Sequence, residues 1–232
     1  MKAKQSASTF PGQMVRWMAI VNLWLAASFS VALAADEAAP VCIVAFGDSL
    51  TAGYMLAPSE AFPEQLAAAL KAKGHAVEIA NAGVSGDTTA AGLARFDWAI
   101  PEGTEAVIVE LGANDALRGI DPDVTRANLD TILTRLRERD IAVLLAGMRA
   151  PKNYGKDYEA RYESIFSDLA AKHGALLYPF FLDGVAMDAR LNQPDGLHPT
   201  AAGVGVIVQG ILPKVEELIG RVRERRTAAS KS

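Results

Sequence analysis

Four short segments of the chain carry residues that together could catalyse acyl transfer. They are Gly47-Asp48-Ser49, the run from Asn81 to Thr88, Gly112-Ala113-Asn114-Asp115, and Asp195-Gly196-Leu197-His198-Pro199. A serine hydroxyl is a weak nucleophile unless a base removes its proton, and a histidine can do so near neutral pH. Ser49 is therefore a candidate nucleophile and His198 its candidate base. Asp195, which precedes His198 in the same segment, could hold the imidazole in the right tautomer and stabilise the imidazolium.

Acyl transfer also needs hydrogen-bond donors for the negative charge that develops on the carbonyl oxygen. The backbone N–H groups of Ser49 and Gly86 and the side-chain amide of Asn114 could supply them. Gly86 has no side chain that would block the approach of a substrate. The segments thus predict an oxyanion hole as well as a nucleophile and its base.

The same residue types also occur for structural reasons alone. Gly, Asp, Ser and Thr are common in βα turns and at helix N-caps, so the first segment by itself decides little. A hydroxyl-rich loop after a first strand also suits a non-catalytic phosphate or flavin binder. That alternative leaves Asn114 and the Asp195/His198 pair without a role. The chain has no Gly-x-Ser-x-Gly segment, which argues against the α/β-hydrolase fold.

An alternation of strand and helix patterns predicts how these segments are positioned. Apolar runs rich in β-branched residues predict strands at 41–46, 77–80, 106–111, 141–146 and 175–178. Helical patterns lie between them at 62–73, 88–98, 122–139 and 158–173, and a last one follows residue 199. This alternation predicts a single α/β domain with a parallel sheet. Because the carboxyl ends of parallel strands share one edge, the segments that follow the strands are expected to meet there.

Composition narrows the class of protein. The chain has 232 residues, of which 50% are hydrophobic and 22% are charged, as expected for one globular domain. Its negative formal charge argues against a nucleic-acid partner. Cys42 is the only cysteine, so no internal disulfide can form and a structural zinc site lacks its thiolates. No two histidines lie at metal-ligand spacing, and we expect neither a metal nor a cofactor.

The two ends of the chain differ from the rest. Residues 1–34 have basic residues without an acid, then an apolar run and the small-residue segment Ala32-Leu33-Ala34, which is the layout of a secretory signal peptide. A retained membrane anchor is the alternative, because the apolar run could nearly span a bilayer. Cleavage after Ala34, which the small residues favour, would change the formal net charge from −4 to −7. We expect one domain over residues 35–220 and a flexible charged tail over 221–232.

Together the four segments resemble the sequence blocks of the SGNH, or GDSL, hydrolases. The blocks are "GDSL", the glycine of "SGDT", "GAND" and "DGLH", and the resemblance extends over nearly all of the chain after residue 40. "FGDSLTAGY", "NAGVSGDTTAAGLAR", "ELGANDALRG" and "APKNYG" are similar to the bacterial periplasmic thioesterase, lysophospholipase and arylesterase branch. The resemblance implies a three-layer, flavodoxin-like sandwich with a five-stranded parallel sheet. It also implies that Ser49 is the nucleophile, that Asp195 and His198 are its partners, and that Ser49, Gly86 and Asn114 are the oxyanion donors.

The resemblance further implies a serine esterase or thioesterase that forms an acyl-enzyme intermediate. Its expected substrates are small molecules: aryl esters, acyl thioesters and lysophospholipids. Removal of an acetyl group from a carbohydrate is an alternative, since the same residues could perform it. We expect a monomer in the periplasm or outside the cell, with no stable membrane anchor after cleavage.

Residues 148–155, after the fourth predicted strand, are expected on the same edge as Ser49. In the resembled branch the matching loop moves when substrate binds. We expect an apolar groove for the acyl chain bordered by Leu117, Ile120, Met148, Pro151 and Tyr154. The alternative is that these residues only pack the loop onto the core.

Four other titratable residues are expected to have structural roles. Asp48 and Asp115 lie in turns, where a short carboxylate commonly accepts backbone hydrogen bonds. His75 follows a glycine in a predicted turn, and His173 ends a predicted helix, where a cation suits the helix dipole.

Overall fold

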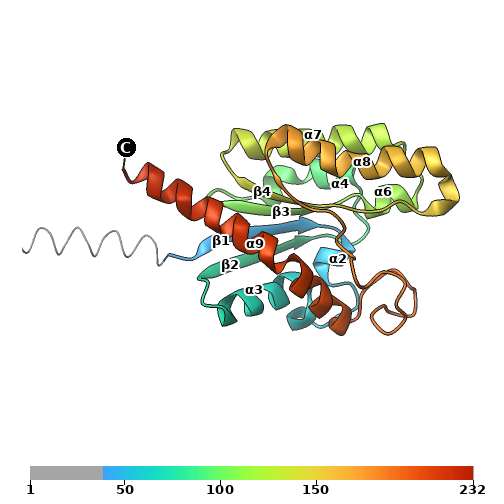
Figure 1. Ribbon diagram of the computed structural model, residues 1–232, viewed down its shortest axis with the longest axis horizontal. Helices are drawn as coiled ribbons and strands as arrows, with labels where there is room; N and C mark the ends of the chain where they lie inside the picture. Colours follow the sequence, from blue (N-terminus) through green and yellow to red (C-terminus); the bar gives the residue numbers. More distant parts are fainter. Residues whose placement is uncertain (1–38, 232) are drawn as a thin grey trace, which may run out of the picture. The chain divides into compact units, whose positions relative to one another are not determined.

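The computed structural model describes residues 39–231, so the predicted signal peptide at 1–34 lies outside it. This part of the chain contains one parallel sheet with the strand order β2-β1-β3-β4-β5 (Figure 1). The strands are β1 (Val41–Gly47), β2 (Val77–Gly83), β3 (Ala106–Glu110), β4 (Ala142–Ala146) and β5 (Leu176–Tyr178). This order is the flavodoxin-like one. The predicted α/β fold with a five-stranded parallel sheet is confirmed.

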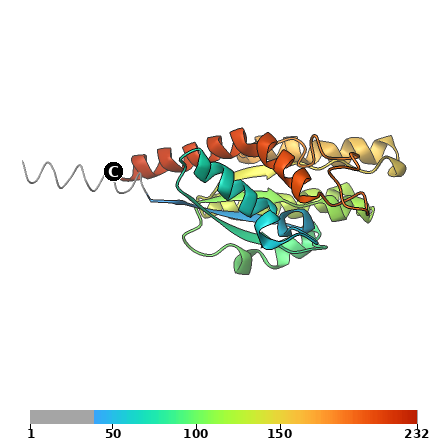
Figure 2. The ribbon, with the colours of Figure 1, turned by 90° about the horizontal axis from the view of Figure 1, so that it is seen from below.

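Helices cover both faces of the sheet (Figures 1 and 2). On one face α3 (Phe62–Ala72) packs against α9 (Ala201–Ala229), and on the other α7 (Pro122–Glu138) packs against α4 (Thr89–Ala94) and α8 (Lys156–His173). Short elements lie in the loops: α2 (Ser49–Ala52), η1 (Pro58–Glu60), α5 (Phe96–Ala99), α6 (Ala113–Leu117) and η2 (Lys152–Tyr154). Within residues 39–231 we find no helix with the length and apolar composition that a membrane crossing requires.

The sheet register brings the ends of β1, β2 and β3 together. Gly47, the last residue of β1, pairs with Gly83 of β2 on one side and with Glu110 of β3 on the other. The central strands β3 and β4 are buried along their whole length because helices cover both of their faces. The loops that follow β1, β2 and β3 therefore begin side by side, above a rigid core.

The helix predicted at 88–98 is two helices, α4 and α5, which are separated at Arg95. The guanidinium of Arg95 donates to the carboxylate of Asp87 at 2.6 Å and to the carbonyl oxygen of Gly47 at 2.9 Å. It also lies 4.5 Å from the centroid of the Phe46 ring. These contacts with the end of β1 join residues far apart in the chain, which a local helical pattern does not reveal.

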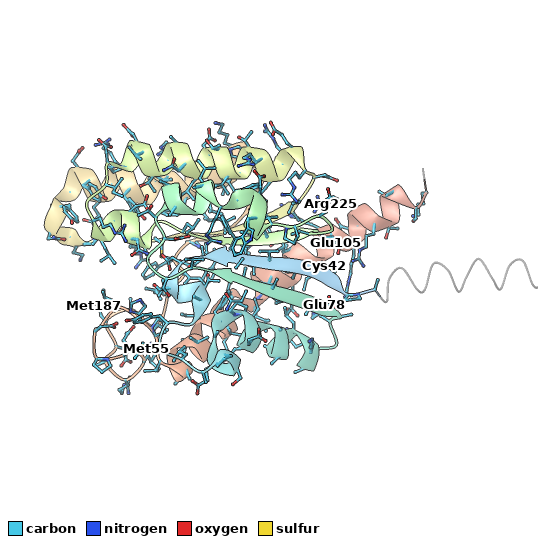
Figure 3. The ribbon with its side chains drawn as sticks, turned by 180° about the vertical axis from the view of Figure 1, so that it is seen from behind. Cys42, Met55, Glu78, Glu105, Met187 and Arg225 are labelled. Carbon is cyan, nitrogen blue, oxygen red and sulfur yellow. The ribbon has the colours of Figure 1, made fainter. Side chains whose placement is uncertain are left out.

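The C-terminal end also differs from the prediction, because α9 continues to Ala229 instead of ending at residue 220. Arg225 donates to the backbone carbonyl and the carboxylate of Asp140, and Arg226 donates to the carboxylate of Glu105 at 2.7 Å. Arg225 and Glu105 lie at the same end of the sheet (Figure 3). Glu105 and Asp140 lie in the segments that lead into β3 and β4. The basic residues that suggested a solvated tail instead hold the last turns of the helix against the sheet.

Candidate active site

Ser49 is the first residue of α2, which begins directly after β1. Asp48 is the N-cap of this helix, and its Oδ1 accepts the backbone N–H of Leu50 at 3.0 Å. The first N–H groups of a helix have no partner inside it, and the N–H of Ser49 makes no hydrogen bond within the part of the chain described. Ser49 is thus largely buried at the carboxyl edge of the sheet, with a hydroxyl and an available N–H.

His198 joins Ser49 to Asp195 by two hydrogen bonds. His198 Nε2 lies 2.9 Å from Ser49 Oγ, and His198 Nδ1 lies 2.6 Å from Asp195 Oδ2. Because a carboxylate only accepts, Nδ1 carries the proton, and Nε2 is left to accept the hydroxyl proton of Ser49. The three side chains that the sequence predicted to act together are in contact, in the arrangement that a nucleophile, a base and an orienting acid require.

The backbone of the loop that contains Asp195 donates hydrogen bonds to the carboxylate of this residue. Asp195 Oδ1 accepts the backbone N–H groups of His198 at 3.0 Å and Leu197 at 2.9 Å. These two hydrogen bonds, with that of the imidazole, lower the pKa of Asp195 to about 2. Gly196 has a φ of +70°, a conformation that suits glycine. The Tyr54 ring lies 4.5 Å from the His198 ring between centroids and covers the imidazole from the side of α2.

The three candidate oxyanion donors lie in the loops that follow β1, β2 and β3. Gly86 has a φ of +86°, and no hydrogen bond of its N–H is found among residues 39–231. Asn114 Nδ2 donates to Asp48 Oδ2 and to the carbonyl oxygen of Asp87, both at 3.0 Å. These two bonds tie the loops together and place the amide of Asn114 beside Ser49 and Gly86. Both amide hydrogens of Asn114 therefore have partners inside the protein.

Comparison with known proteins agrees with this geometry. The sequence pattern of the GDSL-like Lipase/Acylhydrolase family matches residues 45–206. The chain belongs to this family. An arylesterase of Vibrio mimicus is 38% identical over 72% of this chain and 84% of that protein. Thioesterase 1/protease 1/lysophospholipase L1 of Escherichia coli is 34% identical over 82% of this chain and 91% of that protein.

The solved structure of AlinE4, an SGNH-hydrolase family esterase, is 48% identical with a TM-score of 0.66, and the match covers 77% of this chain and 96% of that one. The predicted membership of the SGNH/GDSL hydrolases is confirmed, and the chain is a serine hydrolase that acts on acyl esters.

A cavity of about 380 Å³ opens beside Ser49, His198 and Asn114 of this acylhydrolase. Three of the predicted substrate-binding residues, Leu117, Met148 and Pro151, line it. The sequence did not identify a further part of its apolar wall, which comes from the loop between β5 and α9: Phe180, Leu182, Ala186, Met187 and Leu197. That loop has no helical or strand periodicity, so no local signal assigned it to the site.

Ile120 and Tyr154 do not line this cavity, contrary to the prediction. The Tyr154 hydroxyl donates to the carbonyl oxygen of Leu117 at 3.0 Å, and the Tyr158 hydroxyl donates to that of Ile120 at 2.8 Å. The rings of Tyr154 and Tyr158 lie 5.1 Å apart between centroids. These bonds fasten the loop after β3 to the loop after β4 and to the start of α8.

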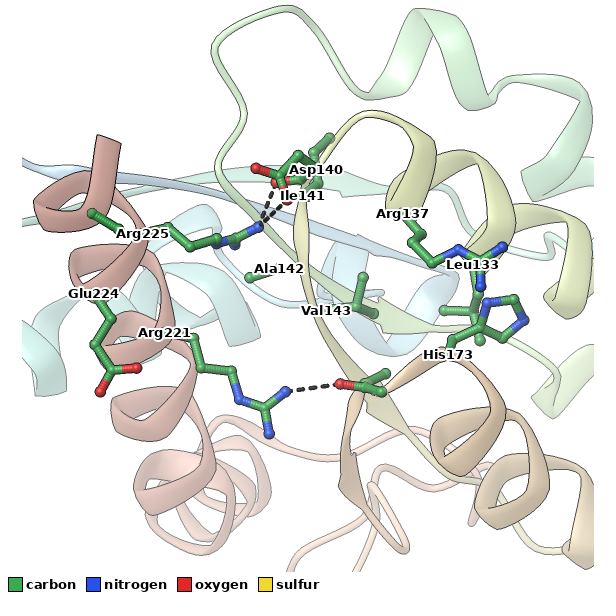
Figure 4. Close-up of a pocket in the computed structure, with 13 residues that line it drawn as sticks. Leu133, Arg137, Asp140, Ile141, Ala142, Val143, His173, Arg221, Glu224 and Arg225 are labelled. Atoms are coloured by element: carbon green, nitrogen blue, oxygen red, sulfur yellow. Dashed lines mark hydrogen bonds and ion pairs between the residues drawn. The ribbon is translucent and has the colours of Figure 1, made fainter. Parts of the chain in front are cut away.

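A larger cavity, of about 470 Å³, lies at the opposite edge of the sheet, where β4 and β5 begin (Figure 4). Its basic residues include Arg221, which donates to the carbonyl oxygen of Gly174 at 2.8 Å, and Arg225, which donates to that of Asp140. Gly174 and Asp140 directly follow the C-terminal ends of α8 and α7, where cations stabilise the exposed carbonyl groups. The cavity is lined by no hydroxyl or thiol side chain, and its arginines cap helix ends.

Asp115 holds its loop through hydrogen bonds, as expected. It accepts the backbone N–H of Thr89 at 2.8 Å and the hydroxyl groups of Thr89 and Thr125 at 2.5 Å and 3.2 Å. Asp115 thereby joins α6, which carries Asn114, to α4 and α7.

The other two histidines are paired with acids. His75 Nε2 lies 2.9 Å from Glu216 Oε1, and His173 Nε2 lies 2.6 Å from Asp130 Oδ1. Both pairs connect separate elements and lie outside the cavity beside Ser49. Over residues 39–231, no group of His, Cys, Asp and Glu side chains is arranged to hold a metal ion.

Glu110 lies at the end of β3, directly beneath α2, and the sequence analysis did not single it out. Its Oε2 accepts the Thr51 hydroxyl at 2.7 Å and the backbone N–H of Asp48 at 3.3 Å, while its buried Oε1 has no partner among the residues described. A Cβ atom at Gly47 would lie 2.5 Å from Glu110 Oε2, so only glycine fits beside this carboxyl. The acid that interrupts the apolar run "AVIVEL" was the available signal.

Burial, and then the charge of Asp48, raise the pKa of Glu110 well above its ordinary value of 4.5. The folded protein therefore keeps a proton that the unfolded chain releases above about pH 4.5, and stability falls as pH rises from that value. We therefore expect the melting temperature of Glu110→Gln minus that of wild type to increase between pH 5 and pH 8. The increase should be roughly 2–4 °C for each kcal/mol of stability that wild type loses over this range and the variant does not.

Thermal melts across this pH range test the prediction, with Glu105→Gln as the control. Burial raises the pKa of Glu105, but the hydrogen bonds from Arg226 and from the N–H of Cys42 outweigh it, so the net shift is downward. The stabilising charge of Glu105 is then fully present above its ordinary value of 4.5, and the effect of Glu105→Gln should not vary between pH 5 and pH 8. Parallel pH dependences for the two variants would mean that Glu110 is ionised in the folded protein.

Proposed function

We propose that this hydrolase cleaves aryl esters, acyl thioesters and lysophospholipids through an acyl-enzyme intermediate on Ser49. The observation that carries the proposal is the continuous chain from Asp195 through His198 to the Ser49 hydroxyl, which opens on an apolar cavity. The similarity to an arylesterase and to a thioesterase 1/protease 1/lysophospholipase L1 supports this range of substrates.

In the first step Ser49 Oγ attacks the acyl carbon while His198 Nε2 takes its proton. The imidazolium is stabilised by Asp195, whose low pKa keeps it ionised. The tetrahedral intermediate collapses when its bond to the alcohol or thiol breaks and His198 returns the proton to that leaving group. Water, deprotonated by His198, then attacks the acyl-serine ester, and the carboxylic acid leaves with Ser49 restored.

Asn114, together with the N–H groups of Ser49 and Gly86, donates to the oxyanion in both steps. We expect Asn114→Ala to lower kcat about 10²–10³-fold with little change in KM, because the lost hydrogen bond is strongest in the transition state. Steady-state kinetics on p-nitrophenyl butyrate measure both constants. A kcat equal to that of wild type would remove Asn114 from the mechanism.

The apolar cavity sets the preferred acyl length. Each methylene buried in it contributes about 0.8 kcal/mol, and Leu117 lines the cavity while remaining 45% exposed. We expect Leu117→Ala to lower the ratio of kcat/KM for p-nitrophenyl octanoate to that for p-nitrophenyl acetate by about fivefold or more.

Val124→Ala is the matched control, since Val124 is 49% exposed and lies outside the cavity. Tyr154→Ala should lower the melting temperature without changing the ratio, because Tyr154 fastens the loop from outside the cavity. An unchanged ratio in Leu117→Ala would contradict an acyl site in this cavity.

A panel of substrates tests the proposed function as a whole. It contains p-nitrophenyl esters of increasing chain length, acyl-CoA thioesters, lysophospholipid and acetylated xylan. We expect activity on the first three and little on xylan, because the cavity wall is mainly aliphatic and aromatic. Preference for acetylated xylan would identify the protein as a carbohydrate acetylesterase.

We also propose that the enzyme acts as a monomer in the periplasm or outside the cell. The basic, apolar and small-residue order of residues 1–34 supports export and cleavage after Ala34. Expression in a Gram-negative host, followed by fractionation and N-terminal sequencing, should find the protein in the periplasm beginning at Ala35. Protein with an intact N-terminus in the membrane fraction would indicate an anchor instead.

A further inference from the structure

Two buried carboxyl groups lie beneath the nucleophile, and the mechanism above uses neither. Asp48 and Glu110 are both fully buried, and the charge of Asp48 raises the pKa of Glu110. Among residues 39–231, no lysine or arginine forms an ion pair with either of them. Unpaired buried charge is costly, so a pair of acids retained at this position calls for a role.

Both oxygens of the Asp48 carboxylate accept hydrogen bonds. Its Oδ1 accepts the N–H of Leu50 and its Oδ2 accepts Asn114 Nδ2, both at 3.0 Å. The second hydrogen of the Asn114 amide goes to the carbonyl oxygen of Asp87 at 3.0 Å. A hydrogen bond to a carboxylate is roughly twice as strong as one to a neutral carbonyl. Of the two bonds that occupy Asn114, the one to Asp87 is therefore the one that gives way to an oxyanion.

We propose that Asp48 is a positioning residue that holds the Asn114 amide by one hydrogen while the other hydrogen exchanges the Asp87 carbonyl for the oxyanion. The proposal deepens the proposed function and rests on the role of Asn114 as an oxyanion donor. It explains why the acid next to the nucleophile faces Asn114 while the other carboxyl faces Thr51 and the backbone of Asp48.

The charge state of Glu110 allows Asp48 to remain ionised in this role. Because burial and Asp48 raise its pKa, Glu110 keeps its proton and the pair carries a single negative charge, on Asp48. Burial also raises the pKa of Asp48, to about 6, against the hydrogen bonds from Leu50, Asn114 and Glu110, which lower it. The other titratable or charged groups around it are His198 before α9, Asp115 of α6, Tyr162 of α8 and the Asp87–Arg95 pair. The hydrogen bond from Asn114 to Asp48 should thus weaken below about pH 6, because the carboxylate of Asp48 becomes protonated there.

A double-mutant cycle tests the proposal. Asp48→Asn keeps the size of the side chain but leaves one acceptor for two donors. We expect it to lower kcat for p-nitrophenyl butyrate about 10- to 100-fold at pH 8 with little change in KM. In an Asn114→Ala background the same change should alter kcat by less than about threefold, because its target is gone. An equal loss in both backgrounds overturns the proposal, since Asp48 then acts independently of Asn114.

Asp121→Asn is the control for loss of an N-cap, because Asp121 caps α7 through the N–H of Asp123 and lies outside the site. It should change the melting temperature and leave kcat unaltered. If Asn114→Ala alone has wild-type kcat, Asn114 is not an oxyanion donor and the proposed function fails at this residue. If instead Asn114→Ala lowers kcat and the two substitutions are additive, Asn114 is a donor but Asp48 does not act through it.

A second measurement needs no change at Asp48 and therefore does not depend on that variant folding. The side-chain ¹⁵N–¹H signals of Asn114, assigned by their loss in Asn114→Ala, are followed with pH in His198→Ala, where the imidazole cannot contribute. We expect them to titrate with a midpoint near the Asp48 pKa of about 6. Signals that stay constant from pH 5 to pH 8 overturn the proposal.

Discussion

Replacing Ser49 with alanine is expected to lower kcat on p-nitrophenyl esters by about 10³-fold or more and to abolish labelling by a fluorophosphonate probe. The probe reacts only with an activated serine, and the Ser49 hydroxyl is the one bonded to the His198–Asp195 pair. Intact mass spectrometry before and after labelling, with kinetics on the same sample, measures both effects.

Ser59→Ala is the matched control for this experiment. Ser59 is an exposed serine in η1, and the structure gives its side chain no contact with His198. It should keep full activity and one equivalent of label. Stoichiometric labelling that persists in Ser49→Ala would show that another residue is the nucleophile.

The second large effect is expected for His198→Ala, with kcat falling about 10³–10⁴-fold. The imidazole both takes the Ser49 proton and returns it to the leaving group, so its loss affects acylation and deacylation together. Asp195→Asn should give a comparable or smaller loss. It leaves the loop in place but offers an amide to Nδ1, which favours the wrong tautomer of His198.

His75→Ala serves as the control, because His75 pairs with Glu216 at the end of the sheet where β2 begins. Pre-steady-state kinetics with p-nitrophenyl acetate separate the two steps. A normal burst of p-nitrophenol in His198→Ala would contradict the role of His198 in acylation.

Much of the site could be predicted because its chemistry lies where strands end. Strand and helix patterns are local, so the alternation in sequence was enough to predict a parallel sheet and the edge where ligands bind. Ser49, Asp195 and His198 lie in segments between a strand and a helix, and residue type and order then predicted the contacts among these three side chains.

Other features depended on contacts between residues far apart in the chain. The bonds from Asn114 to Asp48 and Asp87, and the burial of Glu110 beneath α2, arise only when β1, β2 and β3 align in register. Nothing in the local sequence reports how these groups share hydrogen bonds. Arg225 and Arg226 likewise have the composition of a solvated tail, and only their acid partners on the sheet extend α9.

The wall of the acyl cavity was the least predictable part. Met187 and Leu197 come from an irregular loop whose path is determined by tertiary hydrogen bonds, such as that of Gln193 to the carbonyl oxygen of Tyr54 at 2.8 Å. Conversely, Ile120 and Tyr154 lie in loops at the predicted edge but do not line the cavity, and hydroxyl–carbonyl bonds join these loops to each other and to α8. The sequence by itself determined the fold, the candidate catalytic set and the edge of the sheet, because those follow from periodicity, strand order and residue type. The tertiary structure decided which side chains face the substrate, because loop packing has no period to read.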